Sequence, residues 1–267
     1  MRRGIDSPGP SRRWTGARAS LVRSAPAEAV VGRALPGRGV GMDFGAVSGE
    51  MEGTASVHVR VARLASVRAE ALTCRACRLW QTRRQVVFGE GNPEAALMLV
   101  GEGPGQVEDR VGRPFVGPAG KLLDRALAEA GIERSDLWIT NVVKSRPAER
   151  VGGKLRNRPP RMDEIEACRP WLTAELQIVQ PAVIVCLGAS GANGVIHPGF
   201  KIGEEHSRWF PGPLGAVAMA TYHPSYPLRL TGPSFDRVMA TIVDDLARAY
   251  RRARGAEAEP GRLLSRR

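Results

Sequence analysis

The sequence predicts an α/β protein in three layers, in which helices flank both faces of a central, mostly parallel four-stranded sheet. Short apolar runs of strand length alternate along the chain with longer segments whose apolar residues recur every three to four positions. This alternation favours parallel strands, because each helix carries the chain back to the edge of the sheet where the previous strand began. Polar loops follow several of the strands, where α/β sheets bind their ligands.

The four expected strands are apolar runs that suit burial on both faces. They occupy residues 96–100, 137–143, 182–188 and 216–221. The expected helices follow them, and the first stops at Gly131, a residue typical of helix ends. These helices occupy residues 119–130, 165–179, 189–196 and 235–252.

The chain divides into three parts by composition. Residues 1–68 are rich in Arg, Gly, Pro, Ala and Ser without a sustained period, which predicts a disordered leader. A basic arm that holds DNA is the alternative, and Met42 and Met51 leave open a later start of translation. Residues 69–253 form the expected domain, and residues 254–267 a basic, unstructured tail.

The formal net charge of +12 comes almost wholly from arginine, since the chain has four lysines. A nucleic-acid partner accounts for this charge, and an arginine-rich coding bias is the plainer alternative. The sequence has no apolar run of membrane-spanning length and no signal peptide, so we expect no membrane partner and a cytoplasmic protein. With a nucleic-acid partner, we extend this expectation to a bacterial, nucleoid-associated location. Four cysteines in such a compartment indicate metal ligands or core residues.

A glycine-rich loop at residues 101–109 links the first strand to the first helix. It lacks the lysine of a phosphate-binding loop and the glycine spacing of a dinucleotide site. Its carboxylates, Glu102, Glu108 and Asp109, would repel a phosphate and instead favour a neutral or electron-poor group beside the flat ring of Phe115. The plainer alternative is a tight turn with solvated acids.

Loops after three of the strands carry residues that converge at one edge of the sheet. These are Glu102, Glu108, Phe115, Asn141 and His223. An Asn amide pairs with the edge of a base, an aromatic ring stacks on it, and a His stabilises negative charge on a departing base. For Asn141 alone, a strand-end hydrogen bond to the backbone is the alternative. The basic loop at 145–161, expected to form no helix or strand, suits phosphate contacts, and Leu228 suits a wedge for base flipping.

These motifs resemble those of the iron–sulfur uracil-DNA glycosylases of family 4. The resemblance covers residues 74–252 and rests on segments 101–109, 113–117, 140–144, 157–159 and 223–226, which are spaced as in that family. It implies a uracil-DNA glycosylase-like fold and a monofunctional enzyme that flips uracil out of DNA and hydrolyses its N-glycosidic bond. The protein would thus start base excision repair on single- or double-stranded DNA, as a monomer.

The resemblance also implies roles for single residues. Phe115 would stack on the base, Asn141 would pair with its edge, and His223 would face its carbonyl oxygen. Glu102 and Glu108 would shape the pocket and support the water and the charged sugar. The remaining positions implied to contact substrate are Gly103, Asn157, Ser225, Leu228 and Arg229.

A [4Fe–4S] cluster is the implied cofactor. Cys74, Cys77 and Cys168 match three of the four usual cysteine ligands, and Ser145 stands at the remaining position. Ser145 or water is then the fourth ligand, unless the cluster is labile or absent. Cys186 lies in an apolar run and is expected in the core instead.

Residues 149–156 lengthen the loop in the manner of related glycosylases that trap themselves covalently on the sugar through a loop histidine. This loop has no histidine, Asn157 stands at the matching position, and Gly103 replaces a glutamine typical of that group. We therefore expect turnover rather than self-trapping. Two alternatives remain open: an inactive iron–sulfur nucleic-acid-binding protein, and a glycosylase with a broader range of deaminated bases.

Overall fold

The computed structural model describes residues 48–255, with side chains from residue 56. The leader up to residue 47 and the tail from residue 256 lie outside the described residues, so the expectations for them stay predictions. Within residues 48–255, no helix is long and apolar enough to span a membrane.

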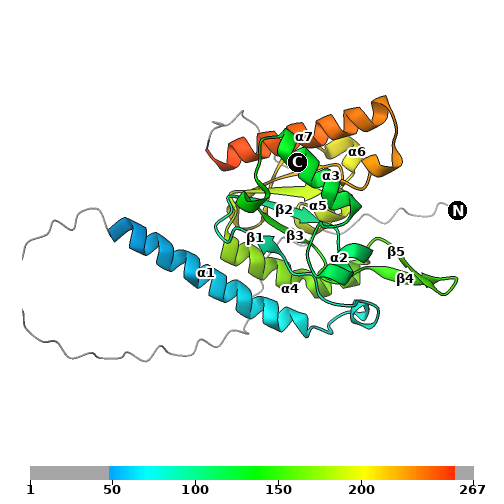
Figure 1. The fold of residues 1–267 in the computed structure, drawn as a ribbon, viewed down its shortest axis with the longest axis horizontal. Helices are drawn as coiled ribbons and strands as arrows, with labels where there is room; N and C mark the ends of the chain where they lie inside the picture. The colour runs from blue at the N-terminus through cyan, green and yellow to red at the C-terminus, as the bar shows by residue number, and fades with distance from the viewer. Residues whose placement is uncertain (1–47, 256–267) are drawn as a thin grey trace, which may run out of the picture. The chain divides into compact units, whose positions relative to one another are not determined.

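The central sheet has six strands in the order β1-β3-β2-β6-β8-β7 (Figure 1). Its four inner strands are parallel, which confirms the expected sheet. They are β2 (Leu97–Gly101), β3 (Trp138–Asn141), β6 (Val183–Leu187) and β8 (Val217–Thr221). The edge strands β1 (Glu90–Gly91) and β7 (Trp209–Pro211) pair antiparallel with their neighbours and were not expected. Strands of two and three residues are too short for an alternation of apolar and polar residues to be visible in the sequence, so no pattern predicts them.

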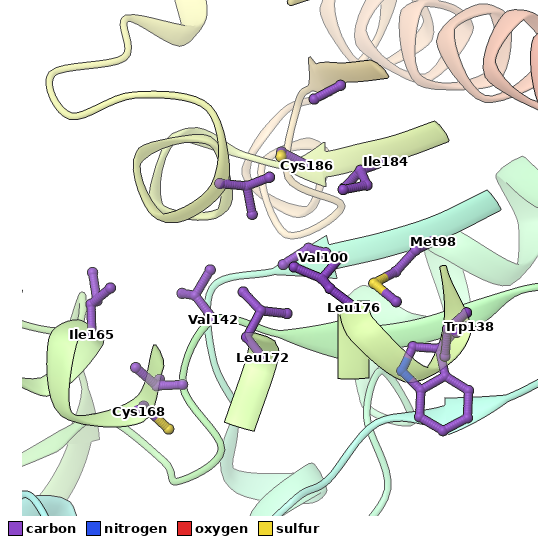
Figure 2. Close-up of a cluster of buried hydrophobic side chains, with 14 of the residues drawn as sticks. Met98, Val100, Trp138, Val142, Ile165, Cys168, Leu172, Leu176, Ile184 and Cys186 are labelled. Atoms are coloured by element: carbon purple, nitrogen blue, oxygen red, sulfur yellow. The ribbon is translucent and has the colours of Figure 1, made fainter. Parts of the chain in front are cut away.

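Two hydrophobic clusters occupy the two faces of the sheet. Met98 and Val100 of β2 pack into the cluster on one face, with α1 (Ser48–Leu72), α4 (Met162–Val179) and α5 (Ala189–Val195). Leu97 and Leu99 point into the cluster on the other face, with α3 (Pro118–Glu129) and α7 (Pro233–Ala253). Figure 1 shows α1 and α4 on one side of the strands and α3 and α7 on the other, and Figure 2 shows the cluster that includes Met98 and Val100. The three-layer prediction is therefore confirmed.

The remaining elements are short. They are α2 (Gln106–Val111), α6 (Ile202–Glu205) and the 3-10 turns η1 (Arg78–Gln81), η2 (Arg134–Asp136), η3 (Pro213–Gly215) and η4 (Pro227–Arg229). Helix α2 forms within the stretch that the sequence presents as a loop.

The expected disorder up to residue 68 is wrong for residues 48–68, which belong to α1. This helix has a weak apolar period, but Leu64 and Ala71 are buried against the body of the domain. Arg60 also reaches the C-terminal end of α4, where its Nη1 donates to Ile178 O at 2.8 Å and Val179 O at 2.7 Å. Tertiary contacts thus hold a helix that its own sequence pattern does not predict.

The expectation that residues 145–161 contain no helix or strand is also wrong. Strands β4 (Ala148–Val151) and β5 (Lys154–Asn157) form an antiparallel hairpin that is separate from the main sheet. Gly152 and Gly153 connect them with φ angles of 57° and 80°, a conformation that suits a two-residue hairpin turn and favours glycine. The Gly-Gly pair was the available signal for this hairpin.

Candidate active site

The carboxyl ends of β2 and β3 meet at Gly101 and Asn141, which are register partners. A Cβ atom at Gly101 would collide with the ring of Phe115 and with Oδ1 of Asn141. Both side chains therefore lie directly over this glycine, and only glycine leaves them room there. The sequence predicts that Phe115 and Asn141 lie together at one edge of the sheet, and the structure places both side chains there.

Phe115 is buried and has a φ angle of 52°, which is unusual for a residue with a side chain. Glu108 of α2 holds this conformation, because its Oε1 accepts hydrogen bonds from the amides of Val116 at 3.1 Å and Gly117 at 2.7 Å. The carboxylate of Glu108 is thus bound to the backbone that follows Phe115. Glu108 is therefore a positioning residue for the Phe115 ring.

Asn141 is 2% exposed, and its Oδ1 has no hydrogen-bond partner within the described residues. A buried polar atom left unpaired costs free energy, so native proteins keep few of them without a reason. The atom faces Phe115 across Gly101, where a flat ring with a hydrogen-bond donor on its edge satisfies both residues.

His223 follows β8, and its ring lies near that of Phe115, with the ring centroids 6.0 Å apart and the planes at 33°. The backbone amide of Ser225 donates to Nδ1 of His223 at 3.0 Å, and Ser225 Oγ lies 2.8 Å from the same nitrogen. Because an amide only donates, Nδ1 accepts, and the neutral ring carries its proton on Nε2. Burial, with the nearby charge of Arg229, lowers the pKa of His223 to about 4. At neutral pH this side chain is an uncharged hydrogen-bond donor.

Glu102 follows Gly101 and is partly buried. Burial raises the pKa of its carboxyl, and a hydrogen bond with Ser190 of α5 opposes that shift. The sequence analysis did not identify Ser190, since a serine at the start of a helix usually caps the backbone. The structure places it after β6, at the same edge of the sheet as the other residues.

The hairpin lies beside the glycine-rich loop. Oδ1 of Asn157, at the end of β5, accepts from Arg146 Nε at 2.7 Å, and its Nδ2 is 3.7 Å from the position of a Cβ on Gly105. Gly103 lies against Val143 and Pro147 at the base of the hairpin. Asn157 is exposed and held by Arg146 at the rim, outside the Phe115–Asn141–His223 group.

The η4 turn follows His223. Leu228 is 51% exposed there, and Arg229 next to it is exposed too. Both follow His223 within six residues, so an apolar tip and a cation stand next to the pocket. The role of Leu228 as a wedge stays a prediction.

Cys74, Cys77, Cys168 and Ser145 line one cavity between the end of α1, α4 and the segment after β3. Within the described residues, no three His, Cys, Asp or Glu side chains are arranged to hold a metal ion. Thiolates are the ligands that iron–sulfur clusters use. Three thiols and a hydroxyl therefore fit the implied cluster.

Neighbouring groups donate hydrogen bonds to these ligand candidates. The Lys144 amide donates to Cys168 Sγ at 3.1 Å, Trp171 Nε1 to Cys74 Sγ at 3.4 Å, and Arg83 Nη1 to Ser145 Oγ at 3.0 Å. Donors of this kind stabilise negative charge on ligand atoms. Burial has the opposite effect and outweighs them at Cys168, where the pKa of the thiol is raised to about 11. Sequence reasoning did not identify Arg83 or Trp171, because neither belongs to a ligand spacing.

Cys186 is on β6 in the hydrophobic core and does not line this cavity. Figure 2 shows it beside Val100 and Ile184, on a different element from Cys168. The expectation that Cys186 does not replace the missing cysteine agrees with this placement.

The protein-family model for the uracil DNA glycosylase superfamily matches residues 88–247. The chain belongs to this superfamily. The match includes the glycine-rich loop, Phe115, Asn141, the hairpin and His223, and it ends within α7.

The chain is similar to individual members of the superfamily that are named as type-4 or type-5 enzymes. The type-4 uracil-DNA glycosylase of Sulfurisphaera tokodaii is 40% identical over 173 residues, which are 61% of this chain and 74% of that protein. The type-4 enzyme of Thermotoga maritima is 41% identical over 178 residues, 66% of this chain and 87% of that protein. A type-5 uracil-DNA glycosylase of Thermus thermophilus is 30% identical over 165 residues, 55% of this chain and 72% of its own length. The resemblance to family 4 is confirmed.

Lys144 follows Asn141 by three residues, but it is bound in the core. It is 1% exposed, and its Nζ lies 2.6 Å from Glu175 Oε2 and 2.6 Å from Thr140 Oγ1. A paired, buried ammonium does not attack a sugar carbon.

Proposed function

We propose that this protein is a monofunctional glycosylase that removes uracil from single- or double-stranded DNA by hydrolysis of the N-glycosidic bond, the step that starts base excision repair. The unpaired Oδ1 of Asn141 over Gly101, beside the ring of Phe115, carries this proposal. Uracil is flat, and its ring N–H can donate the hydrogen bond that Asn141 Oδ1 does not receive from the described residues. Membership of the superfamily and the names of the type-4 relatives support the same substrate.

Each of these residues has a role in the proposed mechanism. Phe115 stacks on the flipped base, and Asn141 accepts its ring N–H, which cytosine does not offer at that position. His223 donates its Nε2 proton in a hydrogen bond to the base carbonyl oxygen on which negative charge grows as the bond to the sugar breaks. A neutral donor suffices there because the ring keeps its proton throughout. Glu102, as a carboxylate, stabilises the cationic sugar and orients the attacking water.

Glu108 takes part indirectly. Since its carboxylate is occupied by the amides of Val116 and Gly117, we assign it to the placement of Phe115 rather than to the water. The pocket then depends on Glu108 for its shape and on Glu102 for its charge.

Turnover rather than covalent trapping is proposed for the same site. The hairpin beside the pocket has no histidine, and Asn157 is exposed and bound to Arg146. An amide is a poor nucleophile, so the sugar cation reacts with water instead.

We propose a [4Fe–4S] cluster held by Cys74, Cys77, Cys168 and, more weakly, Ser145. The cluster supplies no step of the hydrolysis; bound at this site, it would join three segments of the chain by iron–ligand bonds. The residues around it keep the Lys144 segment in place, and this segment continues directly from Asn141. A bacterial cytoplasmic location near the nucleoid and a monomeric state remain predictions.

DNA binding is assigned to the basic surface around the pocket. Arg150, Lys154 and Arg156 are exposed on the hairpin, and Arg229 is exposed on η4. Phosphate contacts by such side chains give affinity without sequence preference. Leu228 fills the space that the flipped nucleotide leaves in the stack.

The test is alkali-induced cleavage of an oligonucleotide with one uracil, in single- and double-stranded form, by the full chain. We expect cleavage at uracil under multiple turnover and no denaturation-resistant adduct. Asn141→Asp is expected to lower the single-turnover rate at least about a hundredfold, because a carboxylate repels the base carbonyl next to the paired N–H. Cleavage of hypoxanthine or ethenocytosine at similar rates would instead indicate a broader glycosylase. DNA binding without cleavage would indicate an inactive binding protein.

A further inference from the structure

Three rings and a guanidinium form a row along the rim that carries His223. The rings of His206 and Tyr222 lie 4.6 Å apart, and those of Tyr222 and Tyr226 lie 5.6 Å apart with their planes at 35°. The guanidinium of Arg229 lies over the Tyr226 ring, 5.7 Å from its centroid. The row runs from two partly buried rings, His206 and Tyr222, to the surface of the domain at η4.

Tyr226 is the exposed end of this row. It is 36% exposed, whereas Tyr222 is partly buried and packs on the core. The backbone amide of Tyr226 donates to His223 O at 2.8 Å, so a tight turn fixes the tyrosine three residues from the catalytic histidine. Its position is therefore set by the same turn that sets His223.

We propose that Tyr226 is the stacking platform for the nucleobase next to the flipped uracil, with Arg229 on the phosphate of that nucleotide. This inference rests on the proposed function and adds the binding site for the flanking nucleotide. An exposed aromatic ring beside a cation is the combination that binds single strands without sequence preference. Base stacking on an aromatic ring is stronger than an exposed cation–π contact, so a base displaces Arg229 from the ring toward its own phosphate.

The platform favours single-stranded DNA. In a duplex the flanking base is already stacked and paired, and Tyr226 gains contact only at the expense of those interactions. In a single strand the flanking base is free. Tyr226 therefore contributes more to the binding of single-stranded than of duplex substrate.

The experiment compares KM and kcat of the full chain and its Tyr226→Ala variant on single- and double-stranded uracil oligonucleotides. We expect KM for the single strand to rise roughly tenfold, with a smaller rise for the duplex and little change in kcat. Tyr226→Phe keeps the aromatic face and should behave like the unaltered protein. A second measurement uses the fluorescence of 2-aminopurine placed next to the uracil. Its emission should be lower in complex with the unaltered protein than with Tyr226→Leu. The leucine variant keeps an apolar contact with Tyr222, so it also serves if the alanine variant does not fold.

Tyr250→Ala is the matched control. Arg254 lies over the Tyr250 ring at 5.4 Å, the same pair of residue types, but Tyr250 contacts Asp136 before β3, at the opposite edge of the sheet. The KM of the Tyr250→Ala variant should equal that of the unaltered protein on both substrates. Equal KM values for Tyr226→Ala and the unaltered protein on single strands, or equal shifts at Tyr226 and Tyr250, would overturn the platform. If the unaltered protein does not cleave uracil at all, the proposed function fails instead.

Discussion

Burial shifts the two ionisable side chains of the pocket in opposite directions. It raises the pKa of the Glu102 carboxyl and lowers the pKa of His223 to about 4, because in both cases the charged form is poorly solvated. His223 is thus already neutral at pH values where Glu102 is still losing its proton. The acid side of the activity profile should report Glu102, since only its carboxylate stabilises the sugar cation.

Ser190→Ala tests this assignment. The hydrogen bond from Ser190 lowers the pKa of Glu102, so its loss should move the acid limb of kcat to higher pH and leave the rate near pH 8 almost unchanged. The measurement is the pH dependence of single-turnover cleavage. Ser66→Ala, at an exposed position of α1, is the control. An unmoved acid limb would show that Glu102 does not set it.

Folding stability depends on His223 in the same pH range. Its folded pKa of about 4 is below the usual unfolded value, so the unfolded chain binds the extra proton first as pH falls. This contribution to stability is complete above about pH 6.5 and declines toward pH 4. His223→Gln should flatten this part of the stability curve, as measured by urea unfolding between pH 4.5 and 7. An unchanged slope would contradict the lowered pKa.

At the scale of secondary structure, the contact between α1 and α4 sets the distance between the cysteines. Cys74 follows the end of α1, and Cys168 lies within α4, so the two thiols face the same cavity only while the helices are docked. Arg60 provides the polar part of this contact at the α4 terminus. A helix C-terminus carries a partial negative charge and unpaired carbonyls, both of which a guanidinium satisfies.

Arg60→Ala should therefore lower the free energy of unfolding by about 1–2 kcal/mol, less than a fully buried charged hydrogen bond would give because the site is partly exposed. Urea denaturation of the full chain measures this. Arg63→Ala, which removes an exposed arginine from the same helix, should cost less than about 0.5 kcal/mol. Equal losses for both variants would mean that Arg60 has no special role at the helix end.

At the scale of the whole molecule, the cysteine cavity joins segments that are far apart in the sequence. The end of α1, the residues after β3 and the middle of α4 all contribute to it. A bound cluster would stabilise the folded state because the unfolded chain does not hold these ligands together. Ser145 is the weakest ligand candidate, since a hydroxyl is a harder ligand than the thiolates that iron–sulfur clusters use.

Ser145→Cys should slow the loss of iron to a chelator by about tenfold or more, as expected when a thiolate replaces an oxygen ligand. Iron and sulfide content and visible absorbance are the readouts, independent of glycosylase activity. Cys186→Ala should leave iron loss unchanged, because Cys186 lies in the core away from the cavity. An equal rate of iron loss from Ser145→Cys and the unaltered protein would show that residue 145 is not a ligand.

Local patterns in the sequence determined the sheet, its main helices and the side chains that gather at its edge. The inner strands and the helices around them are regular enough for their periods to be visible, and parallel strands place their following residues together. The sequence therefore predicts that Asn141, Phe115 and His223 are neighbours. Only the tertiary structure decided which residues distant in the sequence meet: α1 packs on α4, Ser190 reaches Glu102, and Arg83 reaches Ser145. Such contacts have no period along the chain, because they depend on how the packed layers bring separate loops together.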